Sequence, residues 1–93
     1  MNDTLATSVE QLVTILKRSG AKDVYLFGSA AKGTMRNDSD IDLAVSGLPP
    51  ENFFKALSVA SSLLDRSIHL IDLDEVTPFT RYLLEEGELQ RVG

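Results

Sequence analysis

The stretch from Val24 to Val45, VYLFGSAAKGTMRNDSDIDLAV, decides the fold of this chain. It begins within a short apolar run rich in strand-forming residues, and we predict a strand from Asp23 to Phe27 that ends at a glycine. It closes with Asp40 to Val45, where polar and apolar residues alternate as they do in a strand. Residues 29–39 are mostly polar and contain turn signals, so two strands joined by a turn are expected here.

Apolar residues at helical spacing predict helices on both sides of this stretch. The first helix is expected to start with a capping box at Ser8–Gln11, with Asp3 or Thr4 as an earlier alternative, and to stop at Gly20. A second helix is predicted from about Pro50 to Leu64, on a stripe of apolar residues that we interpret as core.

The last third of the chain is predicted to add a strand, a helix and a tail. The strand spans Ser67 to Leu73, and the helix is capped by Thr77 and runs over Pro78–Glu86 to a C-terminal glycine, Gly87. Residues 89–92 are expected to form a short tail. Because a helix separates the strands at 40–45 and 67–73, these two are expected to pair through a crossover in an α/β (α+β) fold.

Composition narrows the kind of protein. The chain has 93 residues, 43% of them hydrophobic, and we expect one small domain over residues 1–93. No cysteine is present, which excludes disulfides and fits a reducing compartment. No apolar run is long enough for a membrane span, and the N-terminus lacks signal-peptide features, so a cytoplasmic protein is expected. A net charge of −5 favours a basic partner or metal ions over nucleic acid.

Two pairs of residues in the opening stretch suggest a site for phosphate and metal. Gly28 lets a ligand approach the backbone closely, and the Ser29 hydroxyl can donate a hydrogen bond to a phosphate. Asp40 and Asp42 are two apart on a strand, so both carboxylates leave the same face and repel unless a cation lies between them. Mg²⁺ prefers such oxygen ligands and shares them with substrate phosphates, which suits nucleotidyl transfer.

Each pair alone is a weak signal. A Gly-Ser after a strand is usually only a turn, and an Asp-x-Asp is usually a solvated strand face. The two pairs together, in strand-turn-strand context, are far more specific.

Gly28-Ser29 followed after ten residues by Asp40-Ile41-Asp42 resembles the signature of the DNA polymerase β-type nucleotidyltransferase superfamily, and above all its minimal nucleotidyltransferase branch. The segments Ile68–Leu73, Pro78-Phe79 and Glu86-Gly87 also resemble that branch. The resemblance implies a small mixed sheet flanked by helices, and transfer of a nucleoside monophosphate from NTP to a hydroxyl with Mg²⁺. It also implies an antitoxin paired with a HEPN-domain toxin. Some antitoxins of this branch inactivate their toxin by adenylylating a tyrosine.

Carried over to this chain, the resemblance assigns the nucleotide and the metal to separate residues. Gly28 and Ser29 would hold the triphosphate, and Asp40 and Asp42 would bind Mg²⁺. Arginines that related sequences carry after Gly-Ser are replaced by Ala30 and Lys32. Lys32 can meet a phosphate only as a point charge, or it is simply a solvated surface residue.

Members of the family usually carry a third carboxylate on the strand that corresponds to residues 67–73. In this chain that position is occupied by His69, the only histidine. Strand alternation places His69 on the face opposite Asp72, so Asp72 cannot take its place without a bulge. A neutral imidazole can accept a proton near pH 7, but it is a poor Mg²⁺ ligand. Three roles for His69 stay open. It acts as a catalytic base, it weakens catalysis because an oxygen ligand is missing, or it is a structural residue of the strand.

Three functions follow from these residues. The first is a Mg²⁺-dependent nucleotidyltransferase that modifies a HEPN toxin with ATP as substrate. The second is a binding module of the same fold that neutralises its partner by occlusion, its chemistry lost through His69. The third is a subunit that modifies a small hydroxylated molecule, as aminoglycoside nucleotidyltransferases do, although 93 residues leave little room for an acceptor-binding domain.

Overall fold

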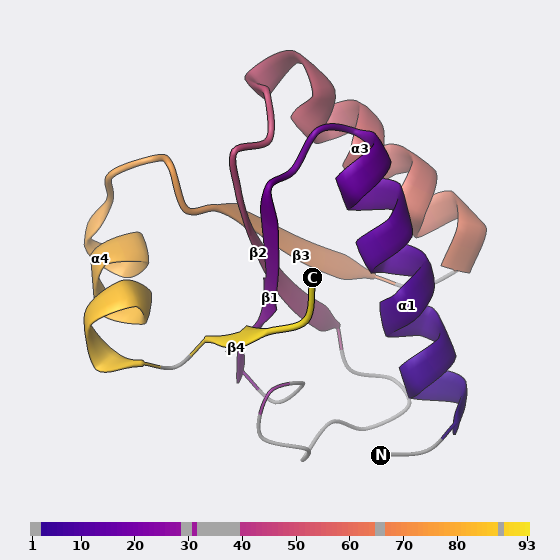
Figure 1. Cartoon of the computed structure of the whole chain (residues 1–93), viewed down its shortest axis with the longest axis horizontal. Helices are drawn as coiled ribbons and strands as arrows, with labels where there is room; N and C mark the ends of the chain where they lie inside the picture. Colours follow the sequence, from indigo (N-terminus) through magenta and orange to yellow (C-terminus); the bar gives the residue numbers. More distant parts are fainter. Residues whose placement is uncertain (1–2, 29–30, 32–39, 65–66, 88) are drawn as a thin grey trace.

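The computed structural model describes residues 3–28, 31, 40–64, 67–87 and 89–93. Three helices and four strands lie in this part of the chain (Figure 1). The helices are α1 (Asp3–Arg18), α3 (Pro50–Leu64) and α4 (Pro78–Glu86), and the strands are β1 (Asp23–Leu26), β2 (Ile41–Ser46), β3 (Ile68–Asp72) and β4 (Gln90–Arg91).

The strands form one mixed sheet in the order β3-β2-β1-β4. β2 pairs with β3 in parallel, whereas β1 is antiparallel to both of its neighbours, β2 and β4. The parallel pair is joined through α3, as the predicted crossover requires. This topology confirms the predicted α/β fold with a small mixed sheet flanked by helices.

Helices cover both faces of the sheet. α1 and α3 pack on one face around Leu12, Leu16 and the inner side of β2, and α4 covers the other face through Leu83 (Figure 1). The central strand β2 is buried from both sides, since Ile41, Leu43, Ala44 and Val45 have no exposed surface. Burial of this strand fixes its register with β1 and β3, and with it the position of the polar residues at the start of β2.

The predicted second and third helices agree with the structure. α3 has the predicted bounds, and α4 begins after Thr77, whose Oγ1 accepts a hydrogen bond from the Thr80 backbone N–H at 3.1 Å. The Thr77 N–H in turn donates to the Thr80 hydroxyl at 2.9 Å, which completes a capping box. Gly87 ends the helix at a φ of 68°, in the left-handed region that favours glycine.

The first helix does not start where its sequence pattern indicated. α1 begins at Asp3, the alternative start, and Ser8 lies inside the helix rather than at its cap. The apolar stripe of Val9, Leu12 and Leu16 defines the buried face of the helix. The stripe does not show how many residues the helix adds before Val9.

The predicted C-terminal tail is also wrong, because it contains the edge strand β4. Gln90 and Arg91 pair with Leu26 and Tyr25 of β1, and the Val92 N–H donates to the Val24 carbonyl oxygen at 2.9 Å. Only two residues form the strand and both are exposed, so no apolar alternation announces it.

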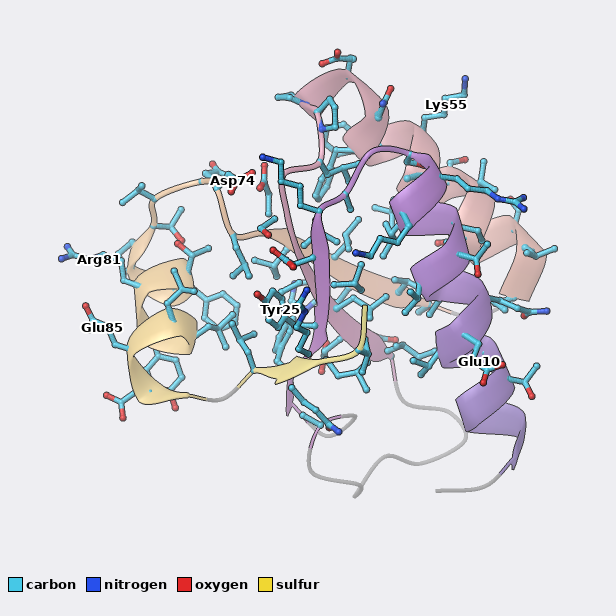
Figure 2. All side chains as sticks on the ribbon, viewed as in Figure 1. Glu10, Tyr25, Lys55, Asp74, Arg81 and Glu85 are labelled. Carbon is cyan, nitrogen blue, oxygen red and sulfur yellow. The ribbon has the colours of Figure 1, made fainter. Side chains whose placement is uncertain are left out.

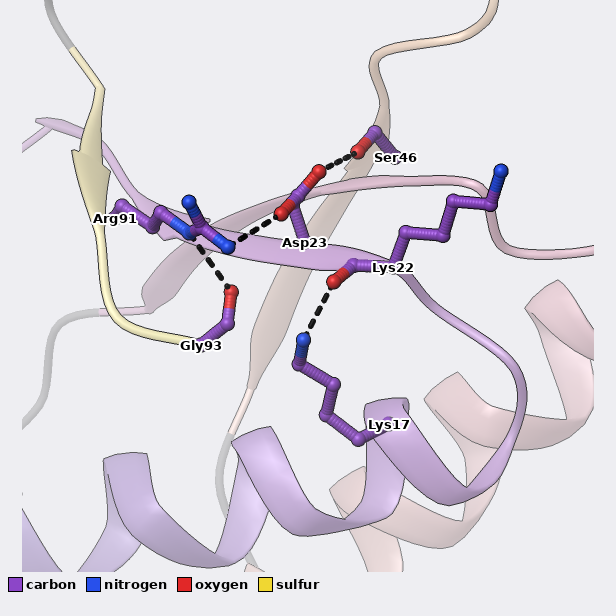
Figure 3. A network of polar contacts seen from close by, with 6 residues as sticks. All are labelled: Lys17, Lys22, Asp23, Ser46, Arg91 and Gly93. Atoms are coloured by element: carbon purple, nitrogen blue, oxygen red, sulfur yellow. Dashed lines mark hydrogen bonds and ion pairs between the residues drawn. The ribbon is translucent and has the colours of Figure 1, made fainter.

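Side chains support this edge of the sheet. Arg91 Nη2 lies 2.9 Å from Asp23 Oδ1, and the Ser46 hydroxyl donates to Asp23 Oδ2 at 3.1 Å (Figure 3). Lys17 of α1 donates to the Lys22 carbonyl oxygen just before β1. These contacts join α1, β1, β2 and β4 at the end of the sheet where β1 begins.

None of the helices described here is long and apolar enough to cross a membrane.

Candidate active site

Asp42 and His69 face each other on the neighbouring parallel strands β2 and β3. Their Cα atoms are register partners, and His69 Nδ1 lies 3.2 Å from Asp42 Oδ1. The Asp42 side chain is 22% exposed and the His69 side chain 53% exposed, so the pair is open to solvent from one side. The sheet thus brings together two residues that are 27 positions apart in the chain.

The orientation of β3 agrees with the alternation prediction. Ile71 and Leu73 lie two and four residues after His69, on the same face by alternation, and both pack in the cluster under α4. Asp72 lines a hollow with Pro50 and Phe53 on the α3 side. Asp72 therefore does not substitute for a carboxylate at the position of His69.

Gly28 lies directly against the Asp42 carboxylate. Its φ is +63°, and a Cβ added there would lie only 2.5 Å from Asp42 Oδ2. The neighbouring Phe27 N–H donates to the Asp42 carbonyl oxygen at 3.1 Å, which holds the two segments together. One carboxylate oxygen of Asp42 thus faces the backbone after β1, and the other faces His69. The absence of a side chain at Gly28 leaves room for this approach.

An aromatic wall flanks His69. The Phe27 ring lies edge-to-face with the His69 ring and with the Phe79 ring of α4, at centroid distances of 5.9 Å in both cases. Phe27 is buried, while Phe79 is 44% exposed. Neither phenylalanine was predicted to belong to the site. Phe27 was interpreted only as the end of a strand, and Phe79 only as part of the Pro78-Phe79 segment at the start of the last helix.

The other predicted site residues are placed less completely. Asp40 is exposed and precedes β2 by one residue. Ser29 and Lys32 lie outside the described residues, so their assignment to the triphosphate stays a prediction. Within the part of the chain that is described, no group of three or more histidine or acidic side chains is arranged to hold a metal ion.

The donor chemistry at Asp42 nevertheless suits a hard cation. Its carboxylate is half-buried beside the Gly28 backbone, and carboxylate oxygens are what Mg²⁺ prefers. Asp40, two residues before Asp42 and just outside β2, is the second carboxylate predicted for such a site. The imidazole of His69 would not be a favoured ligand for this ion.

Comparison with known proteins gives the class of this protein. The family model described as polymerase beta, nucleotidyltransferase matches residues 10–89, which include Gly28, Asp42 and His69. The chain belongs to this nucleotidyltransferase family. No curated protein sequence matches it significantly.

Several solved structures share the fold. A minimal nucleotidyltransferase is 24% identical with a TM-score of 0.75, and the match covers 98% of this chain and 93% of that one. A toxin–antitoxin structure with AMP-PNP is 24% identical with a TM-score of 0.71, covering 88% and 69%. A complex of a tri-AMPylated Shewanella oneidensis HEPN toxin with an MNT antitoxin is 20% identical with a TM-score of 0.68, covering 94% and 70%. These likenesses confirm the nucleotidyltransferase fold.

Proposed function

We propose that this chain is an antitoxin that transfers AMP from ATP, with Mg²⁺, to a tyrosine of a HEPN-domain toxin. The observation that carries the proposal is the meeting of Gly28, Asp42 and His69 at one end of the sheet in a member of the nucleotidyltransferase family. Two structures of the same fold support it: one contains AMP-PNP and the other an AMPylated HEPN toxin bound to an MNT antitoxin. We further propose that it acts in the cytoplasm, where ATP is available.

The proposed reaction joins the tyrosine oxygen to the α-phosphorus of ATP. The bond between that phosphorus and the oxygen bridging to the β-phosphate breaks, pyrophosphate leaves, and the tyrosine proton passes to a base or to water. Asp40 and Asp42 would hold Mg²⁺, which when bound neutralises phosphate charge and favours the attacking oxygen in its ionised form. Gly28 offers backbone to the triphosphate, with Ser29 and Lys32 proposed as further phosphate contacts.

His69 occupies the position at which it can influence this chemistry. Its Nδ1 lies 3.2 Å from Asp42 Oδ1, so it competes with a cation for that oxygen. This contact also favours the second candidate function, in which the chain neutralises its partner by occlusion without transferring a nucleotide.

The experiment that tests the proposal uses ATP labelled on either the α- or the γ-phosphate. Each form is incubated with the chain, Mg²⁺ and a candidate HEPN-domain partner protein. We expect label on the HEPN protein from α-labelled ATP only, and loss of that label when EDTA removes Mg²⁺. Label from γ-labelled ATP would indicate phosphoryl transfer instead. No label from either form, with a stable complex of the two proteins, would favour occlusion.

A further inference from the structure

The exposed aromatic residues of α4 lie on one flank of that helix. Thr80 and Leu83 are buried and mark the side that faces the sheet. Phe79 and Tyr82 are three residues apart, so they are neighbours on the same flank, and they are 44% and 51% exposed. We call these two residues the aromatic flank. Leu84, 57% exposed, lies on the opposite flank, two residues from Tyr82.

The aromatic flank is continuous with the candidate active site. Phe79 contacts Phe27, and Phe27 contacts His69, each pair at a ring-centroid distance of 5.9 Å. His69 in turn contacts Asp42. A molecule that rests on Phe79 and Tyr82 therefore lies at the edge of the site, next to the half-exposed imidazole.

The segment of the chain that contains the aromatic flank is predominantly acidic. The segment from Asp74 to Gly87 carries four carboxylates and a single cation, Arg81. Glu86 lies on the same flank as Phe79 and Tyr82, at a spacing of seven and four residues. Arg81 and Glu85 point away from the sheet on the outer side of α4 (Figure 2). An apolar surface within this acidic segment is complementary to a basic protein surface that presents an apolar contact.

We propose that the aromatic flank is the docking surface for the acceptor protein, and that its partner surface is basic. The inference rests on the proposed function, because an acceptor must bring its hydroxyl to the site while the nucleotide is bound. Docking on Phe79 and Tyr82 places the acceptor beside His69 and Asp42. The acceptor is then selected by a surface outside the chemistry itself.

The test compares two matched variants, Tyr82→Glu and Leu84→Glu, which add the same charge to exposed positions on opposite flanks of α4. Their thermal unfolding is compared with that of the wild type to check the fold. Binding of the candidate HEPN-domain partner protein is measured by calorimetry at low and high salt, and binding of ATP with Mg²⁺ is measured separately. Tyr82→Ala serves as a milder variant at the same position if Tyr82→Glu does not fold.

We expect Tyr82→Glu to weaken HEPN protein binding by about tenfold or more, as loss of an aromatic anchor does, and to leave ATP affinity unchanged. Leu84→Glu should bind like the wild type, and wild-type binding should weaken as salt rises. Equal effects of the two variants, or no HEPN protein binding by the wild type, would overturn the proposal. Binding without AMP transfer contradicts the proposed reaction but leaves this comparison decisive for docking.

Discussion

At the scale of single residues, the contact between Gly28 and Asp42 distinguishes a built site from an ordinary turn. A second glycine, Gly87, provides a matched control, because its φ of 68° is close to the 63° of Gly28 but nothing lies within 4 Å of its added Cβ. A Cβ at Gly28 would instead displace the Asp42 carboxylate, the group proposed to hold Mg²⁺.

Gly28→Ala should therefore lose at least as much stability as Gly87→Ala, and only Gly28→Ala should also weaken nucleotide binding. A left-handed backbone costs a residue with a Cβ roughly 1–2 kcal/mol, which denaturant unfolding measures for both variants. Calorimetric titration with ATP and Mg²⁺ should show a loss of affinity for Gly28→Ala only. Equal affinity in both variants would show that the approach of Gly28 to Asp42 has no role in the site.

His69 is the residue whose replacement says most about catalysis. His69→Asp restores an oxygen ligand opposite Asp42, whereas His69→Asn removes the imidazole without adding charge. Without Mg²⁺ the two carboxylates repel, so His69→Asp should be less stable than His69→Asn, and Mg²⁺ should raise its thermal midpoint more.

We also expect His69→Asp to transfer AMP faster than the wild type at saturating ATP and Mg²⁺. A wild type that is as fast as His69→Asp would show that the missing carboxylate does not limit the rate. If His69→Ala is also much slower than the wild type, the imidazole is a working base. If His69→Ala changes only stability and not the rate per folded molecule, His69 is structural.

At the scale of elements, α4 is held in place by its cap as well as by its apolar side. Thr77 and Thr80 satisfy each other's backbone N–H groups, and the Thr80 hydroxyl also donates to the Glu75 carbonyl oxygen at 2.7 Å. Because α4 carries Phe79 against Phe27, the cap contributes to the position of the aromatic wall beside His69.

Thr77→Ala should lower the free energy of unfolding by about 1 kcal/mol, the usual cost of losing an N-cap side chain. Thr77→Ser keeps the hydroxyl and should recover most of that loss. Denaturant unfolding of the three proteins measures the difference. Equal stability of Thr77→Ala and Thr77→Ser would mean that the capping box does not stabilise the helix.

The elements also show what the sequence could and could not predict. The alternation at Asp40–Val45 predicted which side chains leave each face, because burial of β2 on both sides allows only one register. β4 could not be predicted, because its two residues are exposed and show no apolar alternation. They form a strand only because they pair with the edge of β1. The start of α1 was misplaced because Ser8 can cap a helix but can also lie within one.

The same contrast holds for the candidate site. The spacing of Gly28, Asp42 and His69 was informative because strands convert sequence positions into defined faces, and the structure places these three residues together. The contribution of Phe27 and Phe79 depends on how α4 folds back over the sheet. Such a long-range contact leaves no local signal in the sequence.

At the scale of the whole molecule, we propose that this chain neutralises its partner by modifying it. The direct measurement is intact-protein mass spectrometry of the HEPN-domain protein after co-expression with the wild type, Asp42→Asn or Asp72→Asn. Asp72 serves as the control because it is a carboxylate on the opposite face of the sheet, in the hollow beside α3.

We predict that the HEPN protein carries AMP on a tyrosine after co-expression with the wild type and with Asp72→Asn, and is unmodified with Asp42→Asn. Growth of the cells should be restored only where the modification is found. An unmodified HEPN protein in cells that the wild type protects would contradict the account and would leave occlusion as the mechanism.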